Sequence, residues 1–190
     1  MNTTLTLEQY LTPEDFLAMV EERPDGEVWE LIEGIAYLNP SPIDWHQQIV
    51  SNLIQHLMNL KTARNAEWSV MPGISTRVPS SPKSLPRPDI FVMEGPLTGA
   101  HTTSDALIMV EVLSRSNRPG NQAWRRKVYA SIPNCRHYVT IGMKRADVTR
   151  YDSERNWKGE RLQGLDATLE LPAIEAAIPL RDIYRWTPFE

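Results

Sequence analysis

Two acidic side chains at the ends of apolar runs are the residues best suited to chemistry in this chain. Asp89 stands directly before the run 90–93, and Glu111 lies within the run 107–113. Short apolar runs that are partly β-branched and bounded by Pro or Ser predict buried strands. Because a buried carboxylate without a partner is costly, each acid needs a compensating group. Two carboxylates that converge could share a divalent cation.

A simpler interpretation stays open on the acids alone, in which each one caps a strand or pairs with an arginine. The distribution of charge bears on the choice. Residues 111–150 hold nine Lys and Arg residues and two acids, although the whole chain has a formal net charge of −4. A phosphate-bearing substrate would suit such a basic segment. The segment could equally be a solvated face that pairs with the acidic N-terminal region.

The composition predicts one globular domain that spans residues 1–190. Hydrophobic residues make up 41% of the chain and charged residues 23%, which is ordinary for a globular protein. No apolar stretch approaches the roughly 20 residues needed to span a bilayer, and the N-terminus lacks the pattern of a signal peptide. Cys135 is the only cysteine, which excludes an internal disulfide and fits a reducing compartment. We therefore expect a cytoplasmic protein without a membrane contact, in which Cys135 is a small buried residue.

Local patterns predict the elements that would position the two acids. Thr12 followed by Pro13 is a strong helix start. The expected helices cover 13–22, 44–64 and 119–131, and the expected strands cover 28–32, 35–38, 68–78 with an interruption, 90–93, 107–113, 136–142, 148–151, 157–162 and 168–171. This order indicates an α/β fold with a mixed central sheet flanked by helices. We interpret His46 and His56 as surface or boundary residues, and the proline-rich segment 78–88 as a mobile loop.

The pattern around the two acids resembles that of the PD-(D/E)XK nucleases. Residues i and i+2 of a strand face the same side, so an acid and a lysine two positions later converge in those enzymes. Here Pro88-Asp89 and Glu111-Val112-Leu113 match the pattern, except that Leu113 replaces the lysine. This departure is similar to one branch of the superfamily, the Uma-type putative restriction endonuclease family. The resemblance covers nearly the whole chain and rests on an ordered set of motifs: 29–34, Ser41-Pro42, His46-Gln47, 87–90, 110–114, Tyr129-Ala130 and 137–139.

The resemblance implies a restriction-endonuclease-like fold and metal-dependent hydrolysis of DNA, with Mg²⁺ or Mn²⁺ as the cofactor. Asp89, Glu111 and the carbonyl of Val112 would be the metal ligands. Glu30 matches a family acid on the first hairpin and could complete the acidic cluster, or it could be a surface strand acid. Many nucleases of this superfamily cut two strands with two sites, so we expect a homodimer.

The cationic residue of the family departs from the pattern in this chain. The family has a lysine four residues before its closing tyrosine, and counting back from Tyr129 leads to Arg125. Lys127 lies about 200° further round the helix, so both cannot face one site. An acid of the family is also replaced, by Asn121. Arginine keeps the charge and can hold phosphate with two hydrogen bonds, but it does not readily transfer a proton.

Three interpretations follow from this departure. Arg125 stabilises the phosphate, a shifted register brings Lys127 into the site, or the chain has lost catalysis and its nuclease fold binds nucleic acid or protein. A hydrolase that acts on another phosphate substrate is a further alternative. The sequence has no serine nucleophile elbow and no cysteine–histidine set that would support a covalent mechanism.

Overall fold

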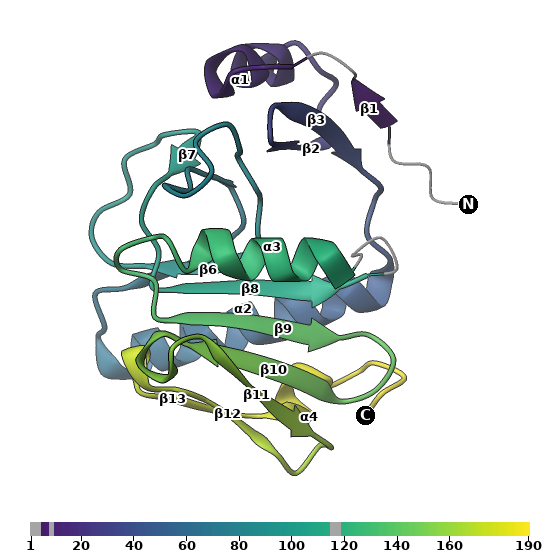
Figure 1. The fold of residues 1–190 in the computed structure, drawn as a ribbon. Helices are drawn as coiled ribbons and strands as arrows, with labels where there is room; N and C mark the ends of the chain where they lie inside the picture. Colours follow the sequence, from purple (N-terminus) through teal and green to yellow (C-terminus); the bar gives the residue numbers. More distant parts are fainter. Residues whose placement is uncertain (1–4, 8–9, 115–118) are drawn as a thin grey trace.

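A six-stranded mixed sheet forms the centre of the computed structural model, which describes residues 5–7, 10–114 and 119–190 (Figure 1). The strand order is β11-β10-β9-β8-β6-β4. Neighbouring strands are antiparallel except for β8 and β9, which are parallel and are separated in the chain by helix α3. The strands are β4 (Ser69–Pro72), β6 (Ile90–Met93), β8 (Ile108–Leu113), β9 (His137–Gly142), β10 (Asp147–Asp152) and β11 (Lys158–Gln163).

Two helices cover opposite faces of this sheet. In Figure 1, α3 (Pro119–Tyr129) lies in front of the sheet and α2 (Asp44–Arg64) lies behind it. The alternation of β8 explains the two cores, because successive side chains of a strand point to opposite faces. Val110 and Val112 join the core that contains Ile49 of α2, whereas Met109 joins the core that contains Tyr129 of α3. Glu111 therefore points towards α3.

The N-terminal region forms a smaller sheet with its own core. Its strands are β1 (Leu5–Leu7), β2 (Val28–Ile32) and β3 (Ile35–Asn39), in the order β1-β3-β2, and helix α1 (Pro13–Glu21) packs against β2. Helix α1 begins with a capping box, in which the Thr12 hydroxyl accepts from the amide of Asp15 and the Asp15 carboxylate accepts from the amide of Thr12. This region brings β2, which carries Glu30, above α3 (Figure 1).

The remaining elements extend the edges of the molecule. Strands β12 (Thr168–Leu171) and β13 (Ala176–Pro179) form a hairpin that leads into helix α4 (Leu180–Ile183). The core beneath α2 includes residues from this hairpin and from α4, such as Ile178 and Ile183. Two short strands, β5 (Ser75–Thr76) and β7 (Thr102–Thr103), pair in parallel, and the 3₁₀ turns η1 (Ser153–Arg155) and η2 (Pro172–Ile174) complete the fold.

The α/β fold with a mixed sheet and flanking helices is as the sequence predicts. The proline-rich segment 78–88 differs from its prediction as a mobile loop. Leu85 is fully buried, and its amide and carbonyl both bond to Leu31 of β2. Burial of an apolar side chain and pairing with a strand fix this segment. Among the described residues, no helix is long and apolar enough to cross a membrane.

Candidate active site

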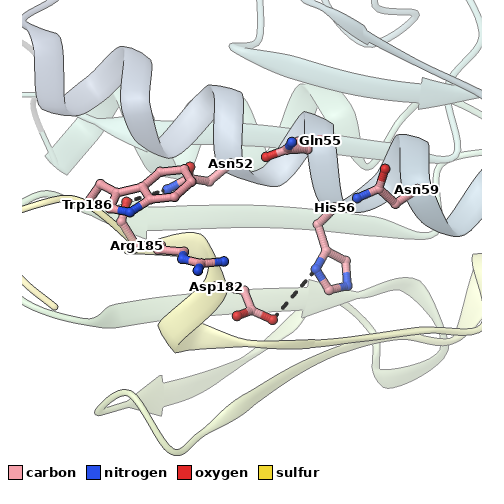
Figure 2. A pocket seen from close by; sticks show the side chains of 7 residues that line it. All are labelled: Asn52, Gln55, His56, Asn59, Asp182, Arg185 and Trp186. Carbon is pink, nitrogen blue, oxygen red and sulfur yellow. Dashed lines mark hydrogen bonds and ion pairs between the residues drawn. The ribbon is translucent and has the colours of Figure 1, made fainter.

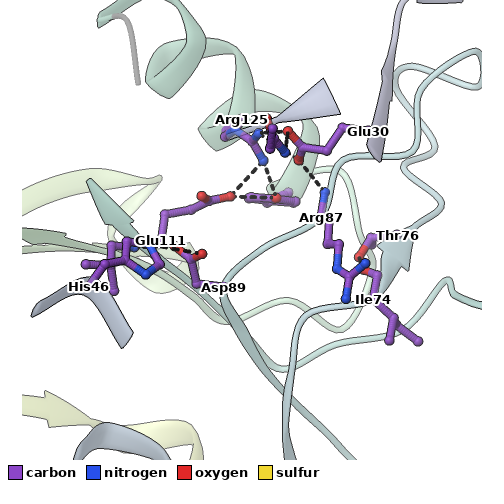
Figure 3. Close-up of polar contacts among 11 residues, drawn as sticks. Glu30, His46, Ile74, Thr76, Arg87, Asp89, Glu111 and Arg125 are labelled. Carbon is purple, nitrogen blue, oxygen red and sulfur yellow. Dashed lines mark hydrogen bonds and ion pairs between the residues drawn. The ribbon is translucent and has the colours of Figure 1, made fainter. Parts of the chain in front are cut away.

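Asp89 and Glu111 are held side by side by backbone hydrogen bonds between β6 and β8. The amide of Asp89 donates to the carbonyl oxygen of Val110 at 3.0 Å. The amide of Val112 donates to Oδ2 of Asp89 at 2.7 Å. Asp89 is thus bonded to the strand on both sides of Glu111, while the Glu111 carboxylate is turned towards Arg125 (Figure 3).

Arg125 of α3 joins Glu111 to a third acid. Its Nη2 lies 2.8 and 2.7 Å from the two carboxylate oxygens of Glu30, and its Nη1 donates to Oε1 of Glu111 at 2.8 Å. The Tyr129 hydroxyl, one helical turn further on, accepts from Nη1 at 3.1 Å and lies 3.0 Å from the same oxygen of Glu111, to which it donates. Glu30, Glu111 and Arg125 are all buried.

Glu30 reaches the cluster from strand β2, and the neighbouring backbone holds it there. The amide of Arg87 donates to Oε1 at 2.6 Å and the side chain of Asn39 donates to Oε2 at 3.0 Å. The Leu31–Leu85 bridge lies next to both contacts and sets this geometry. Glu30 is therefore a buried member of the acidic cluster and not a surface strand acid.

The pKa values of the two buried acids bonded to Arg125 are shifted in opposite directions. Burial raises the pKa of Glu30, but the charge of Arg125 and the hydrogen bonds from Arg125, Arg87 and Asn39 outweigh burial and lower it overall. Burial also raises the pKa of Glu111, and although Arg125 opposes this, the charges of Asp89 and Glu30 add to it, so that the pKa reaches about 8. Burial disfavours the charged form of Arg125, yet Glu111 and Glu30 together raise its pKa well above the usual value. Arg125 thus stays positive while Glu111 is poorly compensated.

The structure brings five of the six predicted site residues together and leaves one outside. Asp89, Glu111, Val112, Arg125 and Glu30 form one contact network. Lys127 is exposed, whereas Arg125, two positions earlier, is buried. The helical period separates them, as expected, and Arg125 is the cation that contacts the acids.

His46 is a site residue that the sequence analysis missed. We expected a surface or boundary residue, but only 8% of His46 is exposed, and its Nε2 lies 3.3 Å from Oδ1 of Asp89. Its Nδ1 is buried and has no hydrogen-bond partner among the described residues. The helical spacing offered a signal, because His46 lies three and four residues before Ile49 and Val50 on the buried face of α2. The sequence carried a similar signal for Tyr129, because a residue four positions after Arg125 lies on the same side of the helix.

Gly73 allows the chain to approach Asp89 closely. A Cβ atom at this position would lie 1.5 Å from the carbonyl oxygen of Pro88. The Gly73 amide donates to the carbonyl of Asp89 at 3.0 Å, and its own carbonyl accepts from Nε of Arg87 at 2.7 Å. Only glycine fits between these groups, so the turn after β4 helps to position Asp89.

The donor set fits a hard divalent cation that is completed by other oxygen ligands. The carboxylates of Glu30 and Glu111 contact the guanidinium of Arg125, whereas that of Asp89 contacts the Val112 amide and His46. Mg²⁺ is usually held by one or two carboxylates together with water and substrate phosphate. Within the described ranges, no three His, Cys, Asp or Glu side chains form a group that could hold a metal by themselves. Asp89 and Glu111 would therefore need the Val112 carbonyl, water and phosphate to complete a coordination shell.

In residues 111–114 and 119–150, several bases of the basic segment are engaged in separate contacts and do not form one continuous cationic face. Arg125 is in the cluster, Arg150 pairs with Glu160 at 2.8 Å, and Arg145 pairs with Asp147 at 3.2 Å. Arg126 lies over the ring of Tyr151 at 4.9 Å. Arg115 and Arg118 lie outside the described residues. Two contacts join the described part of the segment to acids of the N-terminal region, namely Arg125 with Glu30 and the Trp124 indole N–H with Glu33 at 3.4 Å.

Comparison with known proteins places this geometry in a family. No curated protein matches the chain. The crystal structure of a putative nuclease belonging to DUF820 from Anabaena variabilis ATCC 29413 is similar, with a TM-score of 0.75 at 16% identity, over 93% of this chain and 98% of that one. At this identity the likeness establishes the fold. The family model described as Uma2, putative restriction endonuclease, matches residues 13–181. The matched range contains Asp89 and Glu111 as well as Glu30 and Arg125. The chain therefore belongs to the Uma2 family.

Proposed function

We propose that the protein is a cytoplasmic, Mg²⁺- or Mn²⁺-dependent endonuclease that hydrolyses phosphodiester bonds of DNA. Asp89, Glu111 and the carbonyl of Val112 would hold the metal. The observation that carries the proposal is the placement of Asp89, which is hydrogen-bonded to the backbone on both sides of Glu111. A carboxylate held in this way next to a strand that carries a second acid supports the proposal of a site for a divalent cation.

The charges of the cluster explain why a cation is needed. A bound divalent metal would polarise the phosphate and lower the pKa of a coordinated water. Without it, the carboxylates of Asp89 and Glu30 would repel a phosphate, because Arg125 contacts Glu30 and Glu111 and leaves Asp89 without this compensation. A metal ion bound to Asp89 and Glu111 would offset their negative charge and so reduce the repulsion of the phosphate.

In the proposed reaction, Arg125 acts through its positive charge and not as a general acid or base. Its pKa is raised by Glu111 and Glu30, so it retains its proton near neutral pH. Its Nε is buried and has no hydrogen-bond partner among the described residues. Arg125 places a permanent positive charge beside Glu111, where it would oppose the negative charge that develops on the phosphate. Glu30 is a positioning residue, since it holds Arg125 from the far side.

The test is cleavage of supercoiled plasmid DNA by the wild type and by Glu111→Gln. We expect nicked or linear product with Mg²⁺ or Mn²⁺, no product with EDTA, and a loss of at least about a hundredfold in Glu111→Gln. Sedimentation in the same buffer tests the expected homodimer, because cleavage of both strands requires two sites. Equal cleavage by the variant and the wild type would overturn the assignment of Glu111.

A second candidate function is favoured by the ion pairs of Arg125. The guanidinium contacts Glu30 and Glu111 at 2.7–2.8 Å, which is also the geometry of a structural ion-pair network. In that case the protein is a nuclease-fold module that binds nucleic acid or protein without catalysis. It would then bind no metal at Asp89, and Glu111→Gln would leave its binding to DNA unchanged.

A further inference from the structure

A polar hollow lies on α2, lined by residues other than those of the acidic cluster. It has a volume of about 170 Å³ and lies between α2 and the segment that follows α4. Its lining residues are Asn52, Gln55, His56, Asn59, Asp182, Arg185 and Trp186 (Figure 2). Pockets that enclose a small molecule usually measure about 300–1,000 Å³. The hollow is too small for such a ligand and has the size to receive one part of a larger molecule.

Trp186 is held outwards beside the hollow by fixed backbone contacts. Its side chain is 64% exposed, and its φ of 61° is unusual for a bulky residue. The buried side chain of Asn52 donates to the carbonyls of Ile183 at 3.0 Å and Arg185 at 2.7 Å. The Trp186 amide donates to a carboxylate oxygen of Glu190 at 3.0 Å. The structure therefore maintains a strained backbone that presents an indole ring to solvent.

Arg185 lies over this indole ring, with its guanidinium carbon 4.7 Å from the ring centroid. In the described part of the chain, no carboxylate lies within ion-pair distance of Arg185. The one acid of the hollow, Asp182, is instead 3.8 Å from Nδ1 of His56. The hollow thus combines an exposed aromatic plane with a cation that has no carboxylate partner.

The facing side of α2 presents amides in place of the charges that are common on an exposed helix face. Gln48, Asn52, Gln55 and Asn59 follow one another at spacings of three or four residues, which places them on one stripe. Gln48 donates to Asn52, but Gln55 and Asn59 have no hydrogen-bond partner among the described residues. Side-chain amides both donate and accept hydrogen bonds, as required to pair with the edge of a base.

The same helix connects the hollow to the acidic cluster. Gln55 follows His46 by nine residues, which is about 14 Å along the helix axis. Nine residues also turn the helix by about 180°, so a strand from the acidic cluster to the hollow would pass round α2 and span at least about four nucleotides. Trp45, which is 41% exposed, adjoins His46 and lies edge-on to Phe189 at 5.7 Å.

We propose that the hollow binds an unpaired nucleobase of a single-stranded segment of the nucleic acid. Trp186 stacks on the base, Gln55 and Asn59 contact its edge, and Arg185 contacts the adjoining phosphate. Stacking on aromatic rings beside a cationic group is how proteins bind single strands with little sequence preference. The polar lining and the unpaired arginine favour this ligand over a second copy of the chain, whose interface core would be more apolar. The ligand class rests on the proposed function, whereas the binding requires no metal or cleavage.

The test is the anisotropy of a labelled single-stranded 12-mer of mixed sequence, titrated with protein in EDTA so that cleavage cannot occur. Trp186→Ala should weaken binding by about fivefold to a hundredfold. Arg185→Gln should also weaken binding and should reduce the slope of log affinity against log salt by about 0.7. Leu97→Ala, an exposed apolar residue on another segment, is the matched control and should bind as the wild type does.

Three outcomes would overturn this site. They are an absence of oligonucleotide binding by the wild type, equal affinity of Trp186→Ala, and conversion of a dimer to a monomer by Trp186→Ala without a change in oligonucleotide affinity. The third outcome would identify the hollow as a contact between two copies. The plasmid-cleavage test of Glu111→Gln is independent of this binding test. If Glu111→Gln loses cleavage but Trp186→Ala keeps its affinity for the oligonucleotide, the hollow is refuted as a binding site and the proposed hydrolysis still stands.

Discussion

The guanidinium of Arg125 compensates two buried carboxylates, and neither could be exposed to water without rearrangement of the fold. Removal of one partner of a buried ion pair is far more costly than the net contribution of the pair, because the other charge stays buried. Both Glu30 and Glu111 are more than nine-tenths buried, and Arg125 is the cationic side chain that contacts both of them. The replacement of the family lysine by Arg125 suits this task, since a planar guanidinium can contact both acids at once.

Arg125→Ala is therefore expected to lower the free energy of unfolding by about 3–5 kcal/mol at pH 8. Without the guanidinium, burial raises the pKa of both acids above their unfolded values. Acids with a raised folded pKa stabilise the fold at low pH, and this contribution is lost as the pH rises. The loss should thus be smaller at pH 5 than at pH 8, as measured by urea unfolding. Lys127→Ala, on the exposed side of the same helix, should change stability by no more than about 0.5 kcal/mol. Similar losses for the two variants would contradict this account.

The raised pKa of Glu111 predicts a pH dependence of metal binding. Its folded pKa is about 8, so at pH 7 most molecules carry a proton that a metal ion must displace. Affinity for Mn²⁺ should rise by about tenfold per pH unit between pH 6 and 8 and then level off. Calorimetry in two buffers with different ionisation enthalpies should detect the release of nearly one proton per metal at pH 7. Binding that is independent of pH over this range would show that Glu111 is not a ligand.

At the scale of the elements, local sequence determines most of what could be predicted. The capping residue Thr12, the periodicity over 44–64 and the hairpin around Glu33-Gly34 all lead to elements with nearly the expected bounds. Contacts between distant segments were less predictable. Glu30 and Arg125 are 95 residues apart, and the sequence left the role of each open. The sequence predicts a surface or boundary position for His46, whereas its burial depends on a contact with Asp89, 43 residues further along the chain.

The substitution Gly73→Ala tests whether the turn after β4 positions Asp89. A methyl group at this position would overlap the carbonyl of Pro88, so Gly73→Ala must displace the backbone that leads to Asp89. We expect a loss of stability of at least about 2 kcal/mol and a tenfold or larger loss of Mn²⁺ affinity. Gly164→Ala is the control, because its Cβ would meet no atom within 4 Å and it suffers only from its positive φ. The control should lose about 1 kcal/mol and keep its metal affinity. Unchanged affinity in Gly73→Ala would separate this turn from the site.

For the molecule as a whole, Cys135 reports on the core between α3 and the sheet. Only 3% of the residue is exposed, and burial raises the pKa of its thiol to about 12. The thiolate is the reactive form, so the native protein should react with a thiol reagent at pH 8 only when this core opens. We expect the labelling rate to equal the rate of global unfolding, and Ile132→Ala in the same core to accelerate it. Rapid labelling of the native wild type would contradict the packing of this face.

The fold class followed from the sequence because the alternation of strands and helices leaves few ways to bury both faces of a sheet. The surface properties were less accessible to prediction. Nine bases between residues 111 and 150 are compatible with a cationic face, but strand pairing places Arg150 opposite Glu160 of β11, and Arg145 pairs with Asp147 two residues further on. The polar stripe of α2 and the exposed Trp186 converge only in the folded chain, because they are more than 120 residues apart in sequence.

The central claim is that Asp89 and Glu111 together bind a divalent metal ion, and a calorimetric titration of Mn²⁺ tests it without any assumption about the DNA substrate. The wild type should show saturable binding, and Asp89→Asn should abolish it while remaining folded by circular dichroism. Asp89→Asn is close in shape to the native residue, so a loss of binding would report the missing charge. The absence of saturable binding by folded wild-type protein would contradict the account and favour the non-catalytic module.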